Sequence, residues 1–298
     1  MTGMDPDPSS VPSELATRKP TRRFTRRSFL KWAAGGGVVA LIGSYPVFIE
    51  RSTVLMTRYK IPVPNLPTEL AGLRIVHLAD IHHGSLVSLN FVKRVVRLAN
   101  DAGGDLIVNT GDHVHERKST GQIDAVWPIL ADLEAPLGVY SILGNHDHWA
   151  DTDRSVYWLH QTGQDLHHKQ KAIERNGGRL WLVGAGDYWE DHRNLDEEME
   201  GIPESDCRIV LAHNPDSADT SFSKRIDLMV SGHTHGGQVV IPFVGPPVLP
   251  VRNKAYSSGL ISTAKGFDIF ISRGIGWAIY PVRFNCYPEI ATLELFPA

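Results

Sequence analysis

Short apolar runs alternate with longer amphipathic stretches along the body of the chain. Three runs rich in Val, Ile and Leu predict buried strands, at 73–80, 105–112 and 138–147. The segments between them repeat apolar residues at helical spacing and predict helices, at 88–103 and 122–133. Strands and helices that alternate in this way form parallel strands joined by right-handed crossovers.

Six further apolar runs follow with few helices between them. They predict more strands, at 179–187, 207–215, 226–233, 237–242, 267–274 and 289–296. Strands without intervening helices are typical of mixed sheets, so we expect two sheets packed face to face. Residues 148–178 have a helical or irregular character, and we interpret them as a lid.

The N-terminal segment has a different pattern. A Pro- and Ser-rich stretch ends in basic residues, and no charge occurs from Trp32 to Ile49. The sequence TRRSFLK at 25–31 resembles a twin-arginine export signal, and an ordinary membrane anchor is the alternative. Three glycines and Pro46 weaken a membrane span. We expect residues 1–50 to be a disordered region plus this signal or anchor, with the twin-arginine translocase and the membrane as partners. Residues 51–298 would form one domain outside the cytoplasm.

Composition narrows the class of protein. Hydrophobic residues make up 42% of the 298 positions, which is enough for a sizeable core. Residues 61–298 carry twenty Lys and Arg against twenty-nine Asp and Glu. Because nucleic-acid binding relies on a surplus of basic side chains, we expect no nucleic-acid partner. Cys207 and Cys286 have no metal-binding spacing, and two buried free thiols are favoured over a disulfide.

Metal-binding side chains follow five of the predicted strands. In chain order they are Asp80 and His82, Asp112, Asn145 with His146, His213, and His233 with His235. The carboxyl ends of parallel strands form the crevice where ligands bind. Residues at i and i+2 of an extended backbone point to the same side, so His233 and His235 can converge. Glycines at 111, 144 and 232 allow sharp turns before these residues.

These blocks resemble a known family. Asp-x-His, Gly-Asp, Gly-Asn-His-Asp, His and Gly-His-x-His occur across residues 70–240 in the order found in calcineurin-like metallophosphoesterases. The longer forms AHNPD, GHTHGGQ and SRGIG are similar to the YkuE/YaeI-type bacterial phosphodiesterases. The resemblance implies an α/β fold, a four-layer α/β/β/α sandwich of two mixed sheets. It also implies a site for two divalent metal ions.

The resemblance assigns a role to each position. Asp80, His82 and His235 would hold one metal, Asn145, His213 and His233 the other, and Asp112 would bridge them. Imidazole and oxygen ligands suit Mn, Fe, Zn or Co. A metal-bound hydroxide would attack the phosphate ester, and His146 would protonate the leaving group.

One departure from the family concerns the partner that orients His146. Many members have an aspartate three residues after the bridging one, where this chain has His115. Asp147 or a backbone carbonyl is left as the orienting group.

Other polar and aromatic residues have less specific interpretations. His77 is expected to pack in the core, and His160, His167, His168 and His192 to lie on the surface. Arg273 is assigned either to a phosphate or, more readily, to an ion pair. Trp149, Tyr157, Trp158 and Trp189 would form an apolar wall or, more commonly, pack in the core or lid.

The leading hypothesis is an exported, dinuclear metal-dependent phosphodiesterase acting on a phosphoester, of lipid or cell-envelope origin, at the outer face of the cytoplasmic membrane. One alternative is a hydrolase of lipid A synthesis similar to UDP-2,3-diacylglucosamine pyrophosphatase. Another is a non-catalytic metal-binding module of the envelope.

Overall fold

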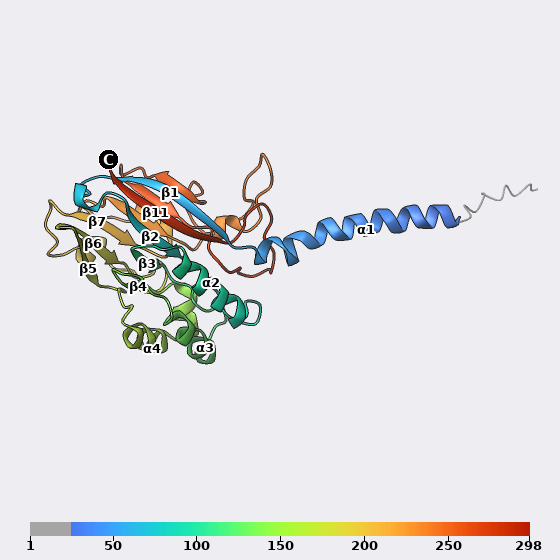
Figure 1. The fold of residues 1–298 in the computed structure, drawn as a ribbon, viewed down its shortest axis with the longest axis horizontal. Coiled ribbons are helices and arrows are strands. Elements are labelled where there is room, and N and C mark those ends of the chain that lie inside the picture. The colour runs from blue at the N-terminus through green and yellow to red at the C-terminus, as the bar shows by residue number, and fades with distance from the viewer. Residues whose placement is uncertain (1–24) are drawn as a thin grey trace, which may run out of the picture. The chain divides into compact units, whose positions relative to one another are not determined.

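The computed structural model describes residues 25–298, except for the side chains of 34–36 and 38–42 (Figure 1). Ser44–Ala298 form one compact unit. Helix α1, Arg26–Phe48, contains Pro46. Within the described residues, no helix has both the length and the hydropathy needed to cross a bilayer. The disordered region expected at the N-terminus falls mostly on residues 1–24, outside the described part.

The first sheet has five strands in the order β1-β11-β2-β3-β4. Their bounds are Leu55–Val63 for β1, Glu289–Pro297 for β11, Leu73–Leu78 for β2, Leu106–Asn109 for β3 and Val139–Ser141 for β4. Strands β2, β3 and β4 are parallel, as the alternation with helices predicts. The C-terminal strand β11 lies between β1 and β2, parallel to β1 and antiparallel to β2, so the sheet is mixed.

The second sheet has six strands in the order β5-β6-β7-β8-β10-β9. Their bounds are Gln170–Arg175 for β5, Gly178–Gly184 for β6, Cys207–Leu211 for β7, Leu228–Ser231 for β8, Asp268–Ile271 for β10 and Gly259–Ser262 for β9. The four central strands are parallel, and both edge strands pair antiparallel to their neighbours. The two mixed sheets confirm the predicted fold class.

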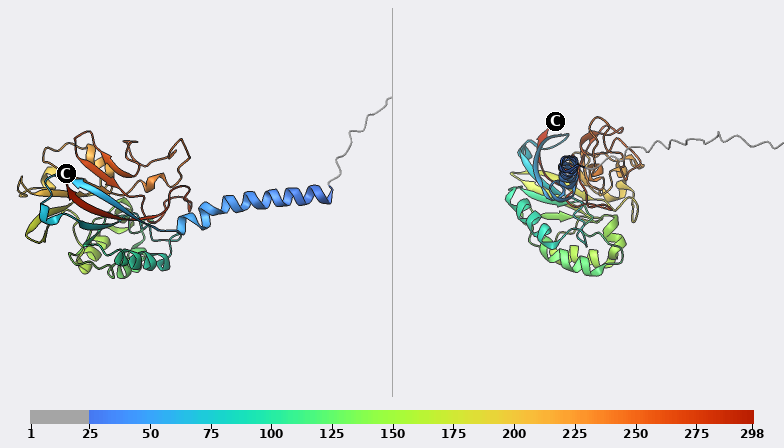
Figure 2. Two further views of the ribbon diagram at one scale, coloured as in Figure 1. Left: turned by 45° about the horizontal axis from the view of Figure 1, so that its top comes forward. Right: turned by 90° about the vertical axis from the view of Figure 1, so that its right-hand side faces the viewer.

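Three apolar clusters hold the layers together. Side chains from both sheets, Leu293 and Phe270 among them, form the cluster between the sheets. The outer face of the first sheet packs against α2, Leu89–Asp101, α3, Thr120–Leu130, and α4, Asn145–Thr162 (Figures 1 and 2). The outer face of the second sheet is covered by the short helix α5, Leu195–Glu198, and by loops. Short 3-10 turns complete the fold, at Glu50–Ser52, Thr68–Leu70, Pro215–Asp219 and His235–Gly237.

Helix α2 shows how local sequence determines an element. The hydroxyl of Ser88 accepts a hydrogen bond from the backbone N–H of Phe91 and caps the N-terminus. Val92, Val95 and Val96 recur at helical spacing and are buried against the sheet. The apolar stripe therefore specifies both the helix and the face that it presents.

Some predicted boundaries are wrong. Residues 237–242 form no strand, because positive φ angles at Gly236, Gly237 and Gln238 turn the chain before Pro242. The third predicted strand ends at Ser141 instead of continuing to residue 147, where α4 has already begun. Residues 148–178, predicted to be helical or irregular, contain most of α4. They also contain the edge strand β5, which the sequence pattern did not indicate. Strands β1 and β9 also lay outside the predicted set.

The cluster between the sheets provides a stability test. Phe270 is fully buried, and its ring lies 4.7 Å from that of Tyr59. Phe270→Ala should lower the free energy of unfolding by about 3–5 kcal/mol, because it leaves a cavity that two sheets cannot close. Urea denaturation followed by circular dichroism measures the loss. Leu260→Ala, at a partly exposed position of β9, is the control and should cost less than about 1 kcal/mol. Equal losses for both variants would contradict this account of the core.

Candidate metal centre

The seven predicted metal ligands all lie just beyond the carboxyl ends of β2, β3, β4, β7 and β8. They are Asp80, His82, Asp112, Asn145, His213, His233 and His235, and each is at most 5% exposed. The structure therefore brings together residues that are up to 155 positions apart in the sequence.

The first group consists of Asp80, His82 and His235. The Nε2 atoms of His82 and His235 lie 3.0 Å apart, and His235 Nε2 lies 3.7 Å from Asp80 Oδ1. The three donor atoms lie within 4.8 Å of one another, a spacing at which one cation can contact all three.

The second group consists of Asp112, His213 and His233. Asn145 is placed close to it, because its neighbours Gly144 and His146 both approach Asp112 Oδ1. His213 Nε2 lies 3.2 Å from Asp112 Oδ2 and 3.1 Å from His233 Nδ1. Asp112 Oδ2 also lies 3.4 Å from His82 Nε2 of the first group. One carboxylate oxygen is thus shared between the two groups.

The hydrogen bonds of the second group fit a cation. His213 donates through Nδ1 to the carbonyl of Thr110 at 2.8 Å, and His233 donates through Nε2 to the carbonyl of Pro250 at 3.0 Å. The other ring nitrogens are then lone-pair donors, and they converge on the Asp112 carboxylate. The amide oxygen of Asn145 is buried without a hydrogen-bond partner. Electron-rich atoms packed in this way require a positive charge among them.

Burial and charge set the protonation of the site. Burial, reinforced by neighbouring charged groups, holds the pKa of His82 and of His235 well below the usual range. Neutral imidazole is the form that binds metals. Burial raises the pKa of Asp112, but His213 and His146 outweigh it and hold that pKa well below its usual range. Burial opposes protonation of His213, yet Asp112 raises its pKa to about 10. The raised pKa shows that the Asp112 carboxylate favours positive charge next to His213 Nε2, the position that a divalent cation would occupy.

The backbone is strained where it presents these ligands. Asp80, His82, Asp112, His233 and His235 have φ angles between 50° and 68°, which L-residues rarely adopt. Such strain persists where the surroundings over-determine the conformation, as at binding sites. A Cβ atom on Gly144 would lie 2.4 Å from Asp112 Oδ1, and one on Gly232 would lie 2.6 Å from Asp80 Oδ2. The glycines are therefore required by close approach to the carboxylates.

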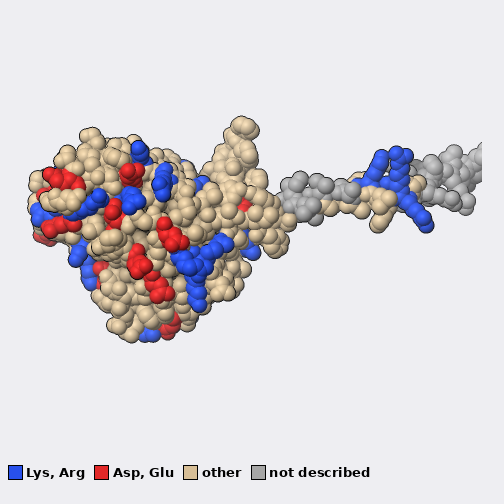
Figure 3. Space-filling model, viewed as in Figure 1, with Lys and Arg blue, Asp and Glu red and all other residues tan. Residues whose placement is uncertain are grey.

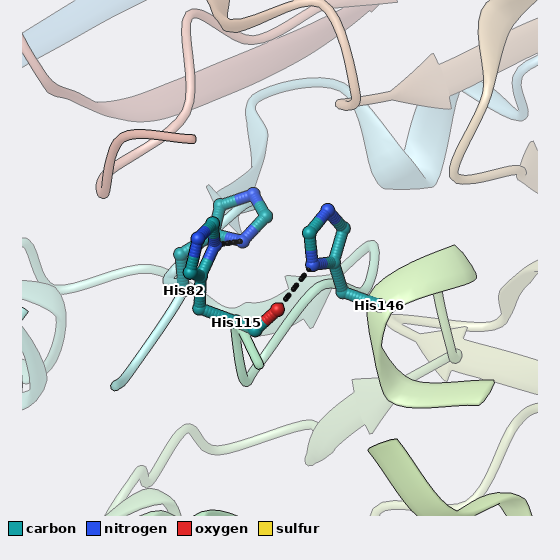
Figure 4. A group of neighbouring side chains, drawn as sticks. All are labelled: His82, His115 and His146. Atoms are coloured by element: carbon teal, nitrogen blue, oxygen red, sulfur yellow. Dashed lines mark hydrogen bonds between the residues drawn. The ribbon is translucent and has the colours of Figure 1, made fainter. Parts of the chain in front are cut away.

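His146 has a different environment from the seven ligands. Its backbone N–H donates to Asp112 Oδ1 at 2.8 Å, and its Nδ1 donates to the carbonyl of His115 at 2.6 Å (Figure 4). The backbone carbonyl, one of the two predicted alternatives, is therefore the orienting group. Asp147 instead accepts hydrogen bonds from the backbone N–H groups of Asp112 and His113 and pairs with the His113 ring. The Nε2 atom of His146 is left available to the site.

The side chain of His115 is a neighbour of the site that sequence reasoning did not identify. Its Nδ1 lies 3.3 Å from Nδ1 of His82, and its ring stacks on that of His146 (Figure 4). The ring of His115 therefore supports the candidate ligand His82, and the backbone carbonyl of His115 orients His146. The only signal in the sequence was its place three residues after Asp112. Arg283 was also missed: it is fully buried, with Nη2 at 3.4 Å from His235 Nδ1.

The aromatic residues divide into two pairs. Trp149 lies 4.7 Å from the His146 ring, and Trp189 lies 4.5 Å from the His233 ring, so these two form a wall of the site. Trp158 instead donates to Asp124, and Tyr157 packs under Arg154.

Other sequence interpretations have clear outcomes. His77 is fully buried and hydrogen-bonded to Thr110, as a core histidine should be. Arg273 pairs with Glu289 at 2.8 Å, which is the predicted ion pair. Both cysteines are buried free thiols.

The surface assignment of His167 and His168 is wrong. His167 is buried and its Nε2 lies 2.7 Å from Asp191, while His168 lies between Asp191 and Glu198. The carboxylates of Asp191 and Glu198 stabilise the two histidines in these buried positions. Asp191 belongs to a loop and Glu198 to a helix, and both are more than twenty residues away in the sequence. The sequence pattern around the histidines gives no sign of them.

The family model of the calcineurin-like phosphoesterases matches residues 73–237, more than half of the chain. This span contains all seven candidate ligands and His146. The chain belongs to the calcineurin-like phosphoesterase family, and it is a hydrolase of phosphoester bonds.

Two curated relatives resemble the chain over nearly its whole length. The uncharacterized metallophosphoesterase YkuE of Bacillus subtilis is 32% identical, covering 92% of this chain and 98% of its own. Phosphodiesterase YaeI of Escherichia coli is 31% identical, covering 91% of this chain and 99% of its own. The crystal structure of TT1561 of Thermus thermophilus has a TM-score of 0.42 at 11% identity, covering 68% of this chain and 89% of its own.

The His168 cluster predicts a pH dependence of stability. Burial lowers the pKa of His168, but hydrogen bonds to Asp191 and Glu198 outweigh it and raise that pKa from 6.5 to about 9. Because the folded pKa is raised, the stabilisation is fully present below pH 6.5 and is lost as the pH rises through about 9. The free energy of unfolding, measured by urea denaturation, should fall between pH 6.5 and about 9 in the parent. It should fall less over the same pH range in His168→Gln. His192→Gln, at an exposed position, should keep the parental dependence. A parental dependence in His168→Gln as well would show that this ion pair is absent.

Proposed function

We propose that the protein is a dinuclear metal-dependent phosphodiesterase at the outer face of the cytoplasmic membrane. One observation carries the proposal: the Asp112 carboxylate touches His82 of one ligand group and His213 of the other. A carboxylate in this position is suited to hold two cations about 3.5–4 Å apart. The name of the relative YaeI supports a diester substrate. The Arg26-Arg27 pair before an apolar segment supports export.

The ligand set determines the charge of the loaded site. Asp80 and Asp112 supply two negative charges, and the imidazoles and Asn145 are neutral ligands. Two divalent cations would leave a net positive charge that attracts a phosphate diester, activates water and neutralises the oxygens of the transition state. Manganese, iron, zinc and cobalt all suit these donors.

His146 is placed to handle the proton of the leaving group. Its Nδ1 is committed to the His115 carbonyl, so a proton that it transfers must be carried on Nε2. The stacked rings of Trp149 and Trp189, whose centroids lie 6.3 Å apart, border this edge of the site. A fixed ring orientation with a single free nitrogen is what general acid catalysis requires.

Removing the shared carboxylate charge tests the dinuclear site. Asp112→Asn keeps the shape but should lose one or both metals and lower hydrolysis of bis-p-nitrophenyl phosphate about a hundredfold or more. Metal content by mass spectrometry and the hydrolysis rate are both measured, and circular dichroism checks folding. Asp132→Asn, at an exposed position, is the matched control. Two bound metals with no hydrolysis in the parent would instead identify a non-catalytic metal-binding module.

Replacing His146 tests the proton transfer. His146→Ala should retain both metals and lose about 10²–10⁴ in rate with esters of poor leaving groups, and much less with nitrophenyl esters. A series of aryl phosphodiesters of rising leaving-group pKa gives the comparison. His192→Ala controls for removal of a histidine. Equal losses across the series would rule out the general-acid role.

A further inference from the structure

A cluster of exposed apolar side chains lies on two loops next to the candidate metal centre. We call it the apolar patch, and its members are Ile241, Phe243, Val244, Val248, Ile279 and Tyr280. Phe243 is completely exposed, and Ile279 is 77% exposed. The two loops are residues 239–250 and 274–282, and neither contains a charged residue. Scattered apolar residues are normal on a surface, but a contiguous group marks an interaction site.

The two loops are fixed to each other. The backbone N–H of Val240 donates to the carbonyl of Phe284 at 2.9 Å, and Gln238 exchanges two hydrogen bonds with the backbone of Ala278. Reciprocal backbone hydrogen bonds between Ile241 and Gly245 close the turn that carries Phe243. The space-filling view shows a projection from the body without basic or acidic atoms (Figure 3). The patch is therefore a preformed feature of the fold.

Two residues of the patch have strained backbone conformations. Phe243 and Ile279 have φ angles of 66° and 61°, although bulky and β-branched side chains strongly disfavour this region. Four prolines between 242 and 250 restrict the loop further. The chain thus holds two large apolar side chains in water at a conformational cost, and an apolar partner would offset that cost.

Residues 46–51, at the start of the compact unit, indicate the kind of partner. The carbonyl of Pro46 accepts a hydrogen bond from the backbone of Arg283, and Arg51 donates to the carbonyl of Pro281. Phe48 and Ile49 are exposed there as well. Residues 46–51 therefore lie beside the loop at 274–282, and Arg51 adds a basic group at its edge. The sequence that leads into them carries no charge from Trp32 onward.

We infer that the apolar patch inserts into the surface of a phospholipid bilayer. Aromatic and aliphatic side chains with basic residues at the rim are the composition that interfacial binding requires. The loops lead directly to the metal centre. The carbonyl of Pro250, at the end of the first loop, accepts a hydrogen bond from His233, and Arg283, which follows the second loop, contacts His235. Docking would bring the centre to the lipid headgroups. Together with the proposed function, this assigns the substrate to phosphodiesters carried by membrane lipids.

A fluorescent label tests insertion in the full-length protein. Val244→Cys is labelled with nitrobenzoxadiazole, and the native thiols are buried and protected. Mixed phosphatidylcholine and phosphatidylglycerol vesicles should raise its emission several-fold, and nitroxide-labelled lipids should quench it. Ser205→Cys, before the amino end of β7, is the control and should not respond. The same weak response from both labels, or a rise at Val244→Cys without vesicles through self-association, overturns the inference.

A charged substitution tests the consequence for the substrate. Phe243→Asp should lower vesicle binding about tenfold or more, because one buried aromatic side chain is lost from the lipid. Hydrolysis of vesicle-borne phosphodiesters should fall equally, while soluble bis-p-nitrophenyl phosphate is cleaved at the parental rate. Tyr157→Asp, an exposed aromatic position outside the patch, should match the parent. Unchanged vesicle binding by Phe243→Asp would refute the docking surface. Failure of the parent to cleave the soluble ester would refute the proposed function alone.

Discussion

The electrostatic requirement of two buried carboxylates determines the rest of the site. Asp80 and Asp112 are withdrawn from water, and each is surrounded by imidazole nitrogens and backbone N–H groups. Hydrogen bonds satisfy one side of each carboxylate. Asp112 Oδ2 faces His82 and His213, and Asp80 Oδ1 faces His235, so lone pairs accumulate there and positive charge must enter. So many polar groups fit into this small volume only with strained turns at the ligands and with glycines, which have no side chain, next to the carboxylates.

The fold meets this requirement by ending parallel strands at one edge. The apolar runs bury β2, β3, β7 and β8 between the layers, and each strand delivers its polar residues immediately afterwards. The two sheets pack face to face, so ligands from β2 and β3 of one sheet meet those from β7 and β8 of the other. Neither sheet alone contains a complete ligand group. The cohesion of the inter-sheet core is thus also what keeps the metal centre assembled.

The sequence allowed the central strands and the ligand set to be predicted, because both depend on local pattern: an apolar run, a glycine and a polar side chain. The edge strands were harder. β1 pairs with β11 across more than 230 residues, and its alternating burial resembles that of many surface segments. The orienting group of His146 could not be chosen either, since a backbone carbonyl has no sequence signature. The carboxylates beside His167 and His168 became visible only in three dimensions. The run at 237–242 shows the opposite failure, because apolar residues that belong to an exposed loop have the pattern of a strand.

The positions of the two thiols give the molecule a pair of internal reporters. Cys207 lies in β7 within the inter-sheet core, and Cys286 donates a hydrogen bond to the carbonyl of His235. Burial raises the pKa of each thiol, so neither reacts while its surroundings remain closed. The speed at which a thiol reagent modifies each one therefore measures how often its own region opens. Comparing the two speeds separates fluctuations around the metal centre from those of the sandwich as a whole.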